Sequence, residues 1–322
     1  YTIEALLNKL LEQALEKKAS DIHIEPQPDQ VRIRQRIDGQ LHEVQMITLA
    51  IYPSLISRLK IMGSMDIAEK RQPQDGHFQV RVGQRDVDFR VSTLPTMNGE
   101  KAVIRILDKN AQRADLADIG MNHEILLGVK KMLAKPHGVI LVTGPTGSGK
   151  TTTVYRMIRQ INDLATNIVT IEDPVEFQVE NINQVQVNPK AGVQFSNTLR
   201  SVLRQDPDVI MVGEIRDAET AEIAVRASLT GHLVISTLHT NNSAGTLSRL
   251  VEMGIEPFLL SSSLLGVLSQ RLVRKLCRHC KEPVAITEEE RELLGAKYVA
   301  ENAQVFKPKG CPRCNGIGYK GR

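Results

Sequence analysis

The sequence predicts an α/β fold whose core is a parallel sheet, with a small α+β domain before the core and a cysteine-rich module after it. Between residues 126 and 240, short apolar strand-like segments alternate with helical segments, which is typical of a parallel sheet covered on both faces. Before residue 110, an amphipathic helical segment precedes segments in which apolar and polar residues alternate. All four cysteines lie between residues 277 and 314, which marks the C-terminal module.

The length of 322 residues exceeds one domain of roughly 100 to 200 residues, and the changes of pattern suggest the boundaries. We expect an N-terminal domain over 1–109, a linker over 110–122, the sheet core over 123–276 and the cysteine module over 277–322.

The N-terminal domain is predicted from two periodicities. Apolar residues recur at every third or fourth position from Ile3 to Leu15, which predicts a helix with one apolar face. From residue 22 the period is two, and Asp38-Gly39 supplies a turn. Strands are expected at 22–25, 31–37, 78–82, 87–91 and 103–107, and a second helix at 51–62.

The core is predicted from apolar runs of strand length. Its strands are expected at 139–142, 168–171, 209–212 and 233–236, whereas the apolar segment 258–268 is predicted as a helix. Ligands of open parallel sheets bind beyond the carboxyl ends of the strands, so the residues that follow each strand are the candidates for function.

Composition excludes several classes of protein. The 41 basic and 37 acidic side chains nearly balance, aromatic residues make up 3% and Trp is absent, so a nucleic-acid groove lined with stacking rings is not indicated. No segment approaches the roughly 20 apolar residues of a membrane span, and no signal sequence opens the chain. We therefore expect a cytoplasmic protein without a transmembrane segment and without a nucleic-acid partner.

A phosphate-binding loop follows the first core strand. The run from Gly144 to Thr151 reads GPTGSGKT and fills every position of the pattern G-x4-G-K-[ST]. Glycines let backbone N–H groups converge on phosphate oxygens, Lys150 reaches the outer phosphates, and the Thr151 hydroxyl is a candidate Mg2+ ligand. An ordinary glycine turn is the alternative, but the preceding strand and following helix disfavour it. The expected nucleotide-binding residues are Gly144, Pro145, Thr146, Gly147, Ser148, Gly149, Lys150, Thr151 and Thr152.

Acidic and histidine residues follow the other core strands. Hydrolysis of a phosphoanhydride needs a metal and a residue that orients the attacking water, so the acidic runs at 172–176 and 213–217 are candidates. Such acids can instead cap the next helix, and Asp217 is expected to do so. His232 and His239 flank the strand at 233–236 as candidate contacts to the γ-phosphate or the acids, although histidines there more often serve the local structure.

The cysteines form two C-x2-C pairs, Cys277 with Cys280 and Cys311 with Cys314. Four thiolates suit a closed tetrahedral zinc site, and a helix at 287–294 is expected to fill the long gap between the pairs. A redox dithiol and disulfides are the alternatives, of which disulfides disagree with a cytoplasmic protein.

Together these motifs resemble the type II/type IV secretion ATPases. The segment 256–274 is more similar to the assembly ATPases of type II secretion than to the extension ATPases of type IV pili. The resemblance covers nearly the whole chain in the family's order, through the segments 19–26, 144–151, 171–176, 204–208 with 213–217, and 231–234 with 236–240.

The resemblance implies a hexameric ATPase with a RecA-like core, over whose nucleotide the N-terminal domain of one subunit packs. It implies that Glu176 is the general base or water-orienting acid and that Glu214 acts on the Mg2+ shell. By the same resemblance, phosphate is contacted within or across subunits by Arg90, Arg105, Arg200 and Arg216. From the residues alone, arginines on a strand face are more typical of solvated ion pairs.

For the whole protein, the resemblance implies that ATP cycling rotates the N-terminal domains against the cores and drives pseudopilus assembly. The expected partners are further copies of the chain and inner-membrane platform proteins, at the cytoplasmic face of the inner membrane. The resemblance also agrees with a zinc module, which assembly ATPases of this family carry and retraction ATPases lack, and this disfavours retraction. Relatives are expected to extend beyond both ends of this sequence. A pilus extension ATPase, a RecA-like nucleic-acid translocase and a nucleotide-gated scaffold are the alternatives.

Overall fold

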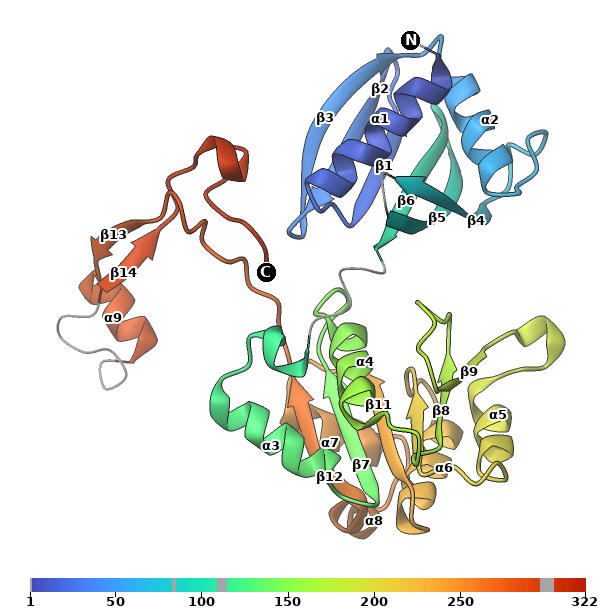
Figure 1. Ribbon diagram of the computed structural model, residues 1–322, viewed down its shortest axis with the longest axis vertical. Helices are drawn as coiled ribbons and strands as arrows, with labels where there is room; N and C mark the ends of the chain where they lie inside the picture. The colour runs from blue at the N-terminus through green and yellow to red at the C-terminus, as the bar shows by residue number, and fades with distance from the viewer. Residues whose placement is uncertain (1, 83–84, 109–114, 296–303) are drawn as a thin grey trace. The chain divides into compact units, whose positions relative to one another are not determined.

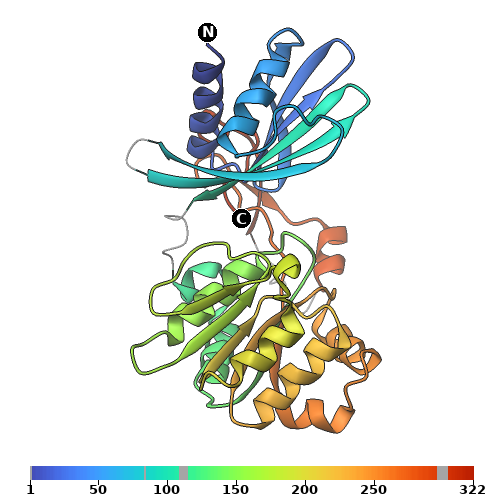
Figure 2. The ribbon, with the colours of Figure 1, turned by 90° about the vertical axis from the view of Figure 1, so that its right-hand side faces the viewer.

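The computed structural model describes residues 2–82, 85–108, 115–295 and 304–322 (Figures 1 and 2). The chain forms two compact units. Unit 1 comprises Tyr1–Val82, Asp88–Ile106 and Leu272–Arg322, and unit 2 comprises Gly83–Val87 and Leu107–Arg271. The predicted division at residues 109, 122 and 276 stays a prediction.

The N-terminal part of unit 1 is an antiparallel sheet with two helices packed on one face (Figure 2). Its strand order is β3-β2-β1-β6-β5-β4, and β1 lies between β2 and β6. The strands are β1 (Asp21–Pro26), β2 (Gln30–Ile37), β3 (Gln40–Thr48), β4 (Gln74–Val82), β5 (Arg85–Thr96) and β6 (Gly99–Asp108). The helices are α1 (Ile3–Glu16) and α2 (Tyr52–Met62). Both predicted helices are therefore confirmed, whereas β3 was not predicted.

Alternation along β1 separates the core of this sheet from its polar face. Ile22 and Ile24 are fully buried, whereas Glu25 takes part in ion pairs with Arg34 at 2.8 Å and Lys101 at 3.0 Å. Burial acts to raise the pKa of Glu25, but hydrogen bonds from Arg34 and Lys101 outweigh it and lower the pKa to about 2. The period of two predicted this division correctly.

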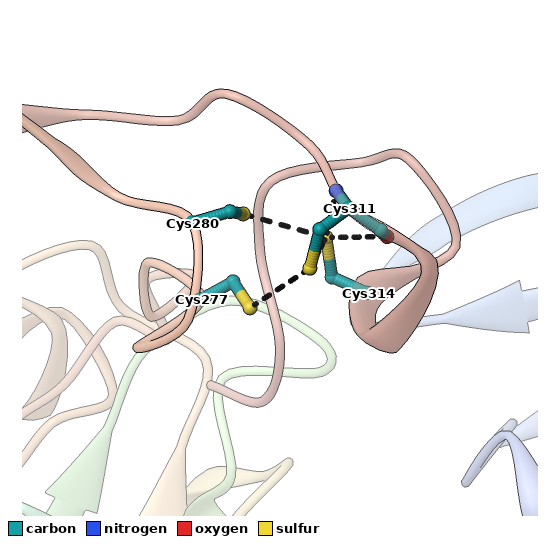
Figure 3. A group of neighbouring side chains, drawn as sticks. All are labelled: Cys277, Cys280, Cys311 and Cys314. Carbon is teal, nitrogen blue, oxygen red and sulfur yellow. Dashed lines mark hydrogen bonds between the residues drawn. The ribbon is translucent and has the colours of Figure 1, made fainter.

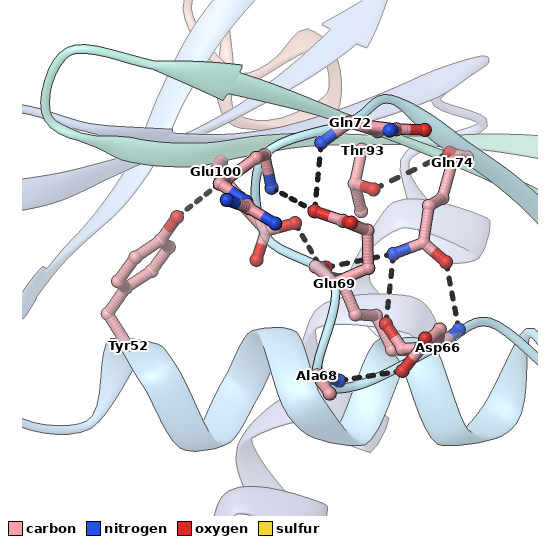
Figure 4. Close-up of polar contacts among 10 residues, drawn as sticks. Tyr52, Asp66, Ala68, Glu69, Gln72, Gln74, Thr93 and Glu100 are labelled. Carbon is pink, nitrogen blue, oxygen red and sulfur yellow. Dashed lines mark hydrogen bonds and ion pairs between the residues drawn. The ribbon is translucent and has the colours of Figure 1, made fainter.

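The connection from α2 to β4 is held by polar contacts (Figure 4). The Gln74 amide donates to the carbonyl oxygens of Asp66 and Glu69, at 2.9 and 3.0 Å. From α2, the Tyr52 hydroxyl donates to the carbonyl oxygen of Glu100 on β6. The Glu100 carboxylate takes part in a buried ion pair with Lys60 of α2 at 2.6 Å. These contacts satisfy polar groups inside the unit and fix α2 to β6.

Unit 2 is an all-parallel sheet of strand order β12-β7-β11-β10-β8-β9 (Figure 1). The strands are β7 (Gly138–Thr143), β8 (Ile168–Glu172), β9 (Asn183–Gln186), β10 (Val209–Val212), β11 (Leu233–Leu238) and β12 (Leu264–Ser269). Every residue of β7, β8, β10 and β11 is buried, as expected for strands covered on both faces. The predicted α/β fold with a parallel sheet is confirmed.

Helices cover both faces of this sheet and enclose two apolar cores. One core involves α3 (His123–Leu133) and α4 (Lys150–Ile161), and the other involves α5 (Phe195–Val202), α6 (Ala218–Leu229), α7 (Ser243–Glu252) and α8 (Pro257–Ser263). Within β7, Ile140 and Val142 face the first core, whereas Val139 and Leu141 face the second. The sheet is thereby fixed from both sides, so the loops at its carboxyl edge start from rigid positions.

The structure corrects one expectation for the core. The segment predicted as a helix at 258–268 is helical only to Ser263, and β12 then pairs with β7, because an apolar run of this length suits a buried strand equally well. Part of the predicted linker, 110–114, lies outside the described residues. Further along that linker, Leu116 begins the short 3-10 helix η2 (Leu116–Ile119) and is only 1% exposed. Leu116 packs in an apolar core of unit 2, and the linker itself stays a prediction.

The cysteine module contains β13 (Glu282–Ala285), α9 (Glu288–Leu294), β14 (Gln304–Lys307) and the 3-10 helix η5 (Pro312–Cys314). The Thr287 hydroxyl caps α9 by accepting from the Glu290 N–H at 3.2 Å, which confirms the predicted helical insert. Among the described residues, no helix is both long and apolar enough to cross a membrane.

Candidate functional site

The loop after β7 has the backbone conformation that its glycines predict. Gly144, Gly147 and Gly149 have φ values of 144°, 76° and 86°, a region that residues with a Cβ rarely adopt. A Cβ at Gly144 would also collide with the carbonyl oxygen of Gln270. Helix α4 begins immediately at Lys150, so its first N–H groups point into the loop and suit an anion.

Lys150 folds back over this loop. Its ammonium donates to the carbonyl oxygens of Gly144 at 2.8 Å and Pro145 at 3.2 Å, and the side chain is largely buried. Burial lowers the pKa of Lys150, while the charge of Glu214 acts in the opposite direction. Thr151 and Thr152 are exposed on the first turn of α4, where a hydroxyl is accessible to a metal ion. Lysine, hydroxyl and backbone N–H groups together fit a nucleoside triphosphate with Mg2+.

The ends of β10 and β11 bring further predicted residues to Lys150. Because these strands pair with Val212 opposite Ser236, the residues that follow them emerge side by side. His239 lies 3.5 Å from the Lys150 ammonium through Nδ1, and 3.5 Å from Glu214 Oε2 through Nε2. The structure thus brings Lys150, His239 and Glu214 into one cluster.

Arg216 extends this cluster toward the loop after β8. It forms an ion pair with Glu214 and contacts Asp173 at 3.3 Å. The hydrogen bond from Arg216 to Glu214 raises the pKa of the guanidinium, which keeps it charged. The acidic residues that follow β8 and β10 are therefore linked by one arginine.

Glu176 lies in the loop that follows β8. Its backbone N–H donates to the Tyr155 hydroxyl of α4 at 3.4 Å, which ties this loop to the helix of the phosphate loop. Glu172, earlier in the same acidic run, is only 3% exposed and accepts from Thr170 at 2.6 Å. The carboxylate of Glu172 is thus bound within the fold, whereas Glu176 follows in the loop.

Four candidates lie elsewhere. His232 precedes β11 and its ring contacts the Ala227 carbonyl oxygen at 2.9 Å, so the length of β11, about 20 Å, separates it from His239. His232 and His239 thus lie at opposite ends of β11, and a contact of His232 with the γ-phosphate or the acids stays a prediction. Arg200 forms an ion pair with Glu219 at 2.7 Å. Arg90 lies on β5 and Arg105 on β6, both in unit 1, and their role stays a prediction.

Asp217 has the structural role that its position predicted. Its carboxylate accepts from the Thr220 N–H at 2.7 Å and caps α6. It is therefore a helix cap, distinct from the Glu214 cluster.

Gln270 is a site residue that sequence reasoning missed. Its amide donates to the Ser148 carbonyl oxygen at 2.7 Å and accepts from the Thr153 hydroxyl at 2.8 Å, and its backbone N–H donates to the Thr143 carbonyl oxygen at 2.9 Å. Gln270 therefore joins the phosphate loop to strand β7 and helix α4. A signal was present in its place directly after an apolar strand, but that strand was interpreted as a helix.

The four cysteines form a second candidate site (Figure 3). Their sulfur atoms all lie within 4.8 Å of one another, with separations of 3.9 Å for Cys277–Cys311 and 3.7 Å for Cys280–Cys314. Tetrahedral zinc with bonds of about 2.3 Å places its sulfurs about 3.8 Å apart, so the donor set fits. The thiols are free rather than joined in disulfides.

Backbone groups tune one of these thiols. Burial acts to raise the pKa of Cys314, but N–H groups of Cys311 and Gly318 that donate to its sulfur lower the pKa to about 6. Such hydrogen bonds favour the thiolate, the form that binds metal.

Comparison with known proteins identifies the family of this chain. All residues, 1–322, match the family described as type II/IV secretion system protein. The type II secretion system ATPase E of Vibrio cholerae serotype O1 is 54% identical over 320 residues, which cover 98% of this chain and 63% of that protein. The type II secretion system protein E of Dickeya dadantii is 53% identical over 317 residues, with the same coverage. The chain thus spans about 63% of the length of these relatives.

Solved structures show the same architecture. The pilus retraction motor PilT, determined with bound ADP, superposes with a TM-score of 0.62 at 34% identity, over 83% of this chain and 78% of that one. The ATPase DotB of Legionella pneumophila gives a TM-score of 0.68 at 25% identity, over 90% of this chain and 83% of that one. With its phosphate loop, its acidic strand ends and its match over the whole sequence, this chain belongs to the type II/IV secretion system protein family.

Proposed function

We propose that this chain is the motor region of an ATPase that hydrolyses ATP to drive pseudopilus assembly and protein export by a type II secretion system. The observation that carries the proposal is the cluster of Lys150, His239 and Glu214 beside the phosphate loop. In this proposal Lys150 is the cation for phosphate and Glu214 the acid for the metal shell, and the edge of a parallel sheet where ligands bind supports both roles. The identity of 54% to a type II secretion ATPase favours secretion as the process that it drives.

Each residue has a role that follows from its position. The loop N–H groups and Lys150 bind the β- and γ-phosphates, and the Lys150 ammonium exchanges its carbonyl partners for phosphate oxygens. The Thr151 hydroxyl and Glu214 hold Mg2+ directly or through its water shell. When bound, Mg2+ supplies charge neutralisation on the phosphates. Glu176 orients the attacking water and accepts its proton.

The remaining candidates respond to the phosphate. His239 contacts both Lys150 and Glu214, so the position of the imidazole should change when phosphate binds beside Lys150. Arg216 and Arg200, in unit 2, stabilise negative charge on the phosphates. Arg90 and Arg105 do the same from unit 1 of the same or a neighbouring subunit. A guanidinium that arrives only in one domain arrangement couples hydrolysis to movement.

The setting of the whole protein follows from the family. We propose a homohexamer that acts at the cytoplasmic face of the inner membrane and contacts platform proteins of the secretion system. Zn2+, held by Cys277, Cys280, Cys311 and Cys314, gives the C-terminal module its structure, because a module this small has little apolar core of its own.

The test is ATP turnover and ATP binding by the 322-residue chain. Lys150→Ala should lose both, whereas Glu176→Gln should keep binding and lose turnover by about a hundredfold or more. Lys131→Ala, on the exposed end of α3, and Glu222→Gln, exposed on α6, are the matched controls. Turnover that persists in Lys150→Ala or Glu176→Gln at the level of its control would contradict the assigned role.

A further inference from the structure

A buried carboxylate connects the strand beneath the acidic loop to the helix of the phosphate loop. Glu172 ends β8 and is 3% exposed. It accepts hydrogen bonds from the Tyr155 hydroxyl, from the Thr170 hydroxyl at 2.6 Å and from the Gln184 amide at 3.0 Å. All three donors are neutral, so they stabilise this buried carboxylate by hydrogen bonds. Removal of one donor leaves a buried carboxylate oxygen with one hydrogen bond fewer, which is unfavourable.

The Tyr155 hydroxyl also accepts a hydrogen bond from the acidic loop. While the O–H group donates to Glu172, the oxygen accepts from the backbone N–H of Glu176 at 3.4 Å. The ring also packs against Phe177, with centroids 4.1 Å apart. Burial and Glu172 both raise the pKa of Tyr155, so the hydroxyl remains a donor across the neutral range.

Tyr155 lies on the same face of α4 as Thr151. Tyr155 is four residues after Thr151, so both side chains lie on one face of the helix, about 6 Å apart along its axis. The face of α4 that presents a hydroxyl to the metal thus holds the loop of Glu176 one turn further along.

We propose that Tyr155 is a positioning residue, whose hydroxyl sets the distance between Glu176 and the phosphate loop. The inference rests on the proposed function, because it assigns Tyr155 a role in the hydrolysis that Glu176 performs. A shift of about 1 Å in a reacting group is enough to slow an enzyme greatly. The loss of one hydrogen bond to the Glu176 backbone can therefore reduce the rate of hydrolysis.

A purely structural role makes a different expectation. If the Tyr155 hydroxyl only stabilises the core, its removal should lower the melting temperature and leave the turnover of the folded protein unchanged. Tyr52 offers a matched comparison, because its buried hydroxyl donates to the Glu100 carbonyl oxygen in unit 1. Tyr52→Phe therefore removes the same atom from a similar environment without touching the acidic loop.

The experiment compares Tyr155→Phe with Tyr52→Phe in the 322-residue chain with ATP and Mg2+. Tyr155→Phe keeps the ring on Phe177, so the protein should fold and bind ATP with unchanged Kd and KM. Its kcat should fall about tenfold, whereas Tyr52→Phe should keep the wild-type kcat. In the Glu176→Gln background, Tyr155→Phe should change the residual turnover less than twofold, because the group that it positions is already lost.

Hydrogen exchange gives a readout that needs no turnover. The amide of Glu176 donates to the Tyr155 hydroxyl, so its exchange should become about tenfold faster in Tyr155→Phe. Unchanged kcat in Tyr155→Phe, or a tenfold loss that adds to that of Glu176→Gln, would overturn the inference while leaving the proposed function intact. If the wild-type chain hydrolyses no ATP, the proposed function fails instead, and unchanged exchange at Glu176 would still overturn the positioning by Tyr155.

Discussion

The imidazole of His239 bridges Lys150 and Glu214, with one ring nitrogen 3.5 Å from the ammonium and the other 3.5 Å from the carboxylate. This arrangement arises because β11 lies between β7, which leads to Lys150, and β10, which leads to Glu214. A lysine and an acid on strands that are not neighbours are thus connected through the strand between them. The contact links the group that binds phosphate to the group assigned to the metal shell.

The two nitrogens of His239 can be tested separately. His239→Asn retains a polar atom near Nδ1, and His239→Gln retains one near Nε2. We expect His239→Ala to lower kcat about tenfold with little change in ATP affinity, because the loop N–H groups and Lys150 remain. If the contact to Glu214 dominates, His239→Gln should recover more activity than His239→Asn. Wild-type kcat in His239→Ala would show that the bridge has no part in turnover.

Gln270 should control the order of the phosphate loop. Gln270→Ala removes two side-chain hydrogen bonds, to Ser148 and from Thr153, and should cost about 1–3 kcal/mol in the free energy of unfolding. ATP affinity should fall by about three- to tenfold, because the loop must then be ordered by the ligand itself. Gln270→Glu places an oxygen against the Ser148 carbonyl and should be worse. Denaturation curves and ATP titrations measure both effects, and equal affinity in all three proteins would contradict this role.

The phosphate loop could be predicted from sequence because all of its residues are contiguous. Its pattern predicts the roles of Lys150 and Thr151, and the strand pattern predicts that Glu214 and His239 follow their strands at one edge of the sheet. The sequence pattern marked the two histidines as a pair, but it did not show that His232 and His239 lie at opposite ends of β11.

The contacts of Tyr155 and Gln270 could not be predicted in this way, since their partners are distant in sequence. Gln270 contacts Ser148 across 122 positions, and this contact exists only because β12 pairs with β7. An apolar run of six residues is compatible with either a helix or a strand. This run is a strand because it can pair with β7 at the edge of the sheet. Glu172 likewise belongs to the acidic run in the sequence, but the donors from α4, β8 and β9 that satisfy its buried carboxylate are seen only in the fold.

Glu25 should make the stability of unit 1 depend on acid pH. Its pKa falls from 4.5 to about 2 in the folded chain, so the carboxylate stabilises the fold above pH 4.5 and this contribution is lost as the pH falls towards 2. With the Glu25 side chain 8% exposed, Glu25→Gln should cost about 1–3 kcal/mol at pH 7. Denaturation at pH 7 and pH 3 should show the difference shrinking, and Glu12→Gln on α1 is the control. A difference that is constant with pH would contradict the ion-pair explanation.

The cysteine cluster should bind one zinc ion per chain, measured by elemental analysis after purification under reducing conditions. Cys314→Ser removes the sulfur that accepts from two backbone N–H groups and should lose the metal. His279→Ala should keep it, since His279 contacts Arg313 rather than the sulfurs. Cys314→Ser should also expose residues 277–322 to proteolysis while ATP binding persists, because the phosphate loop belongs to unit 2. Metal-free wild-type protein with a protease-resistant module would refute the zinc site.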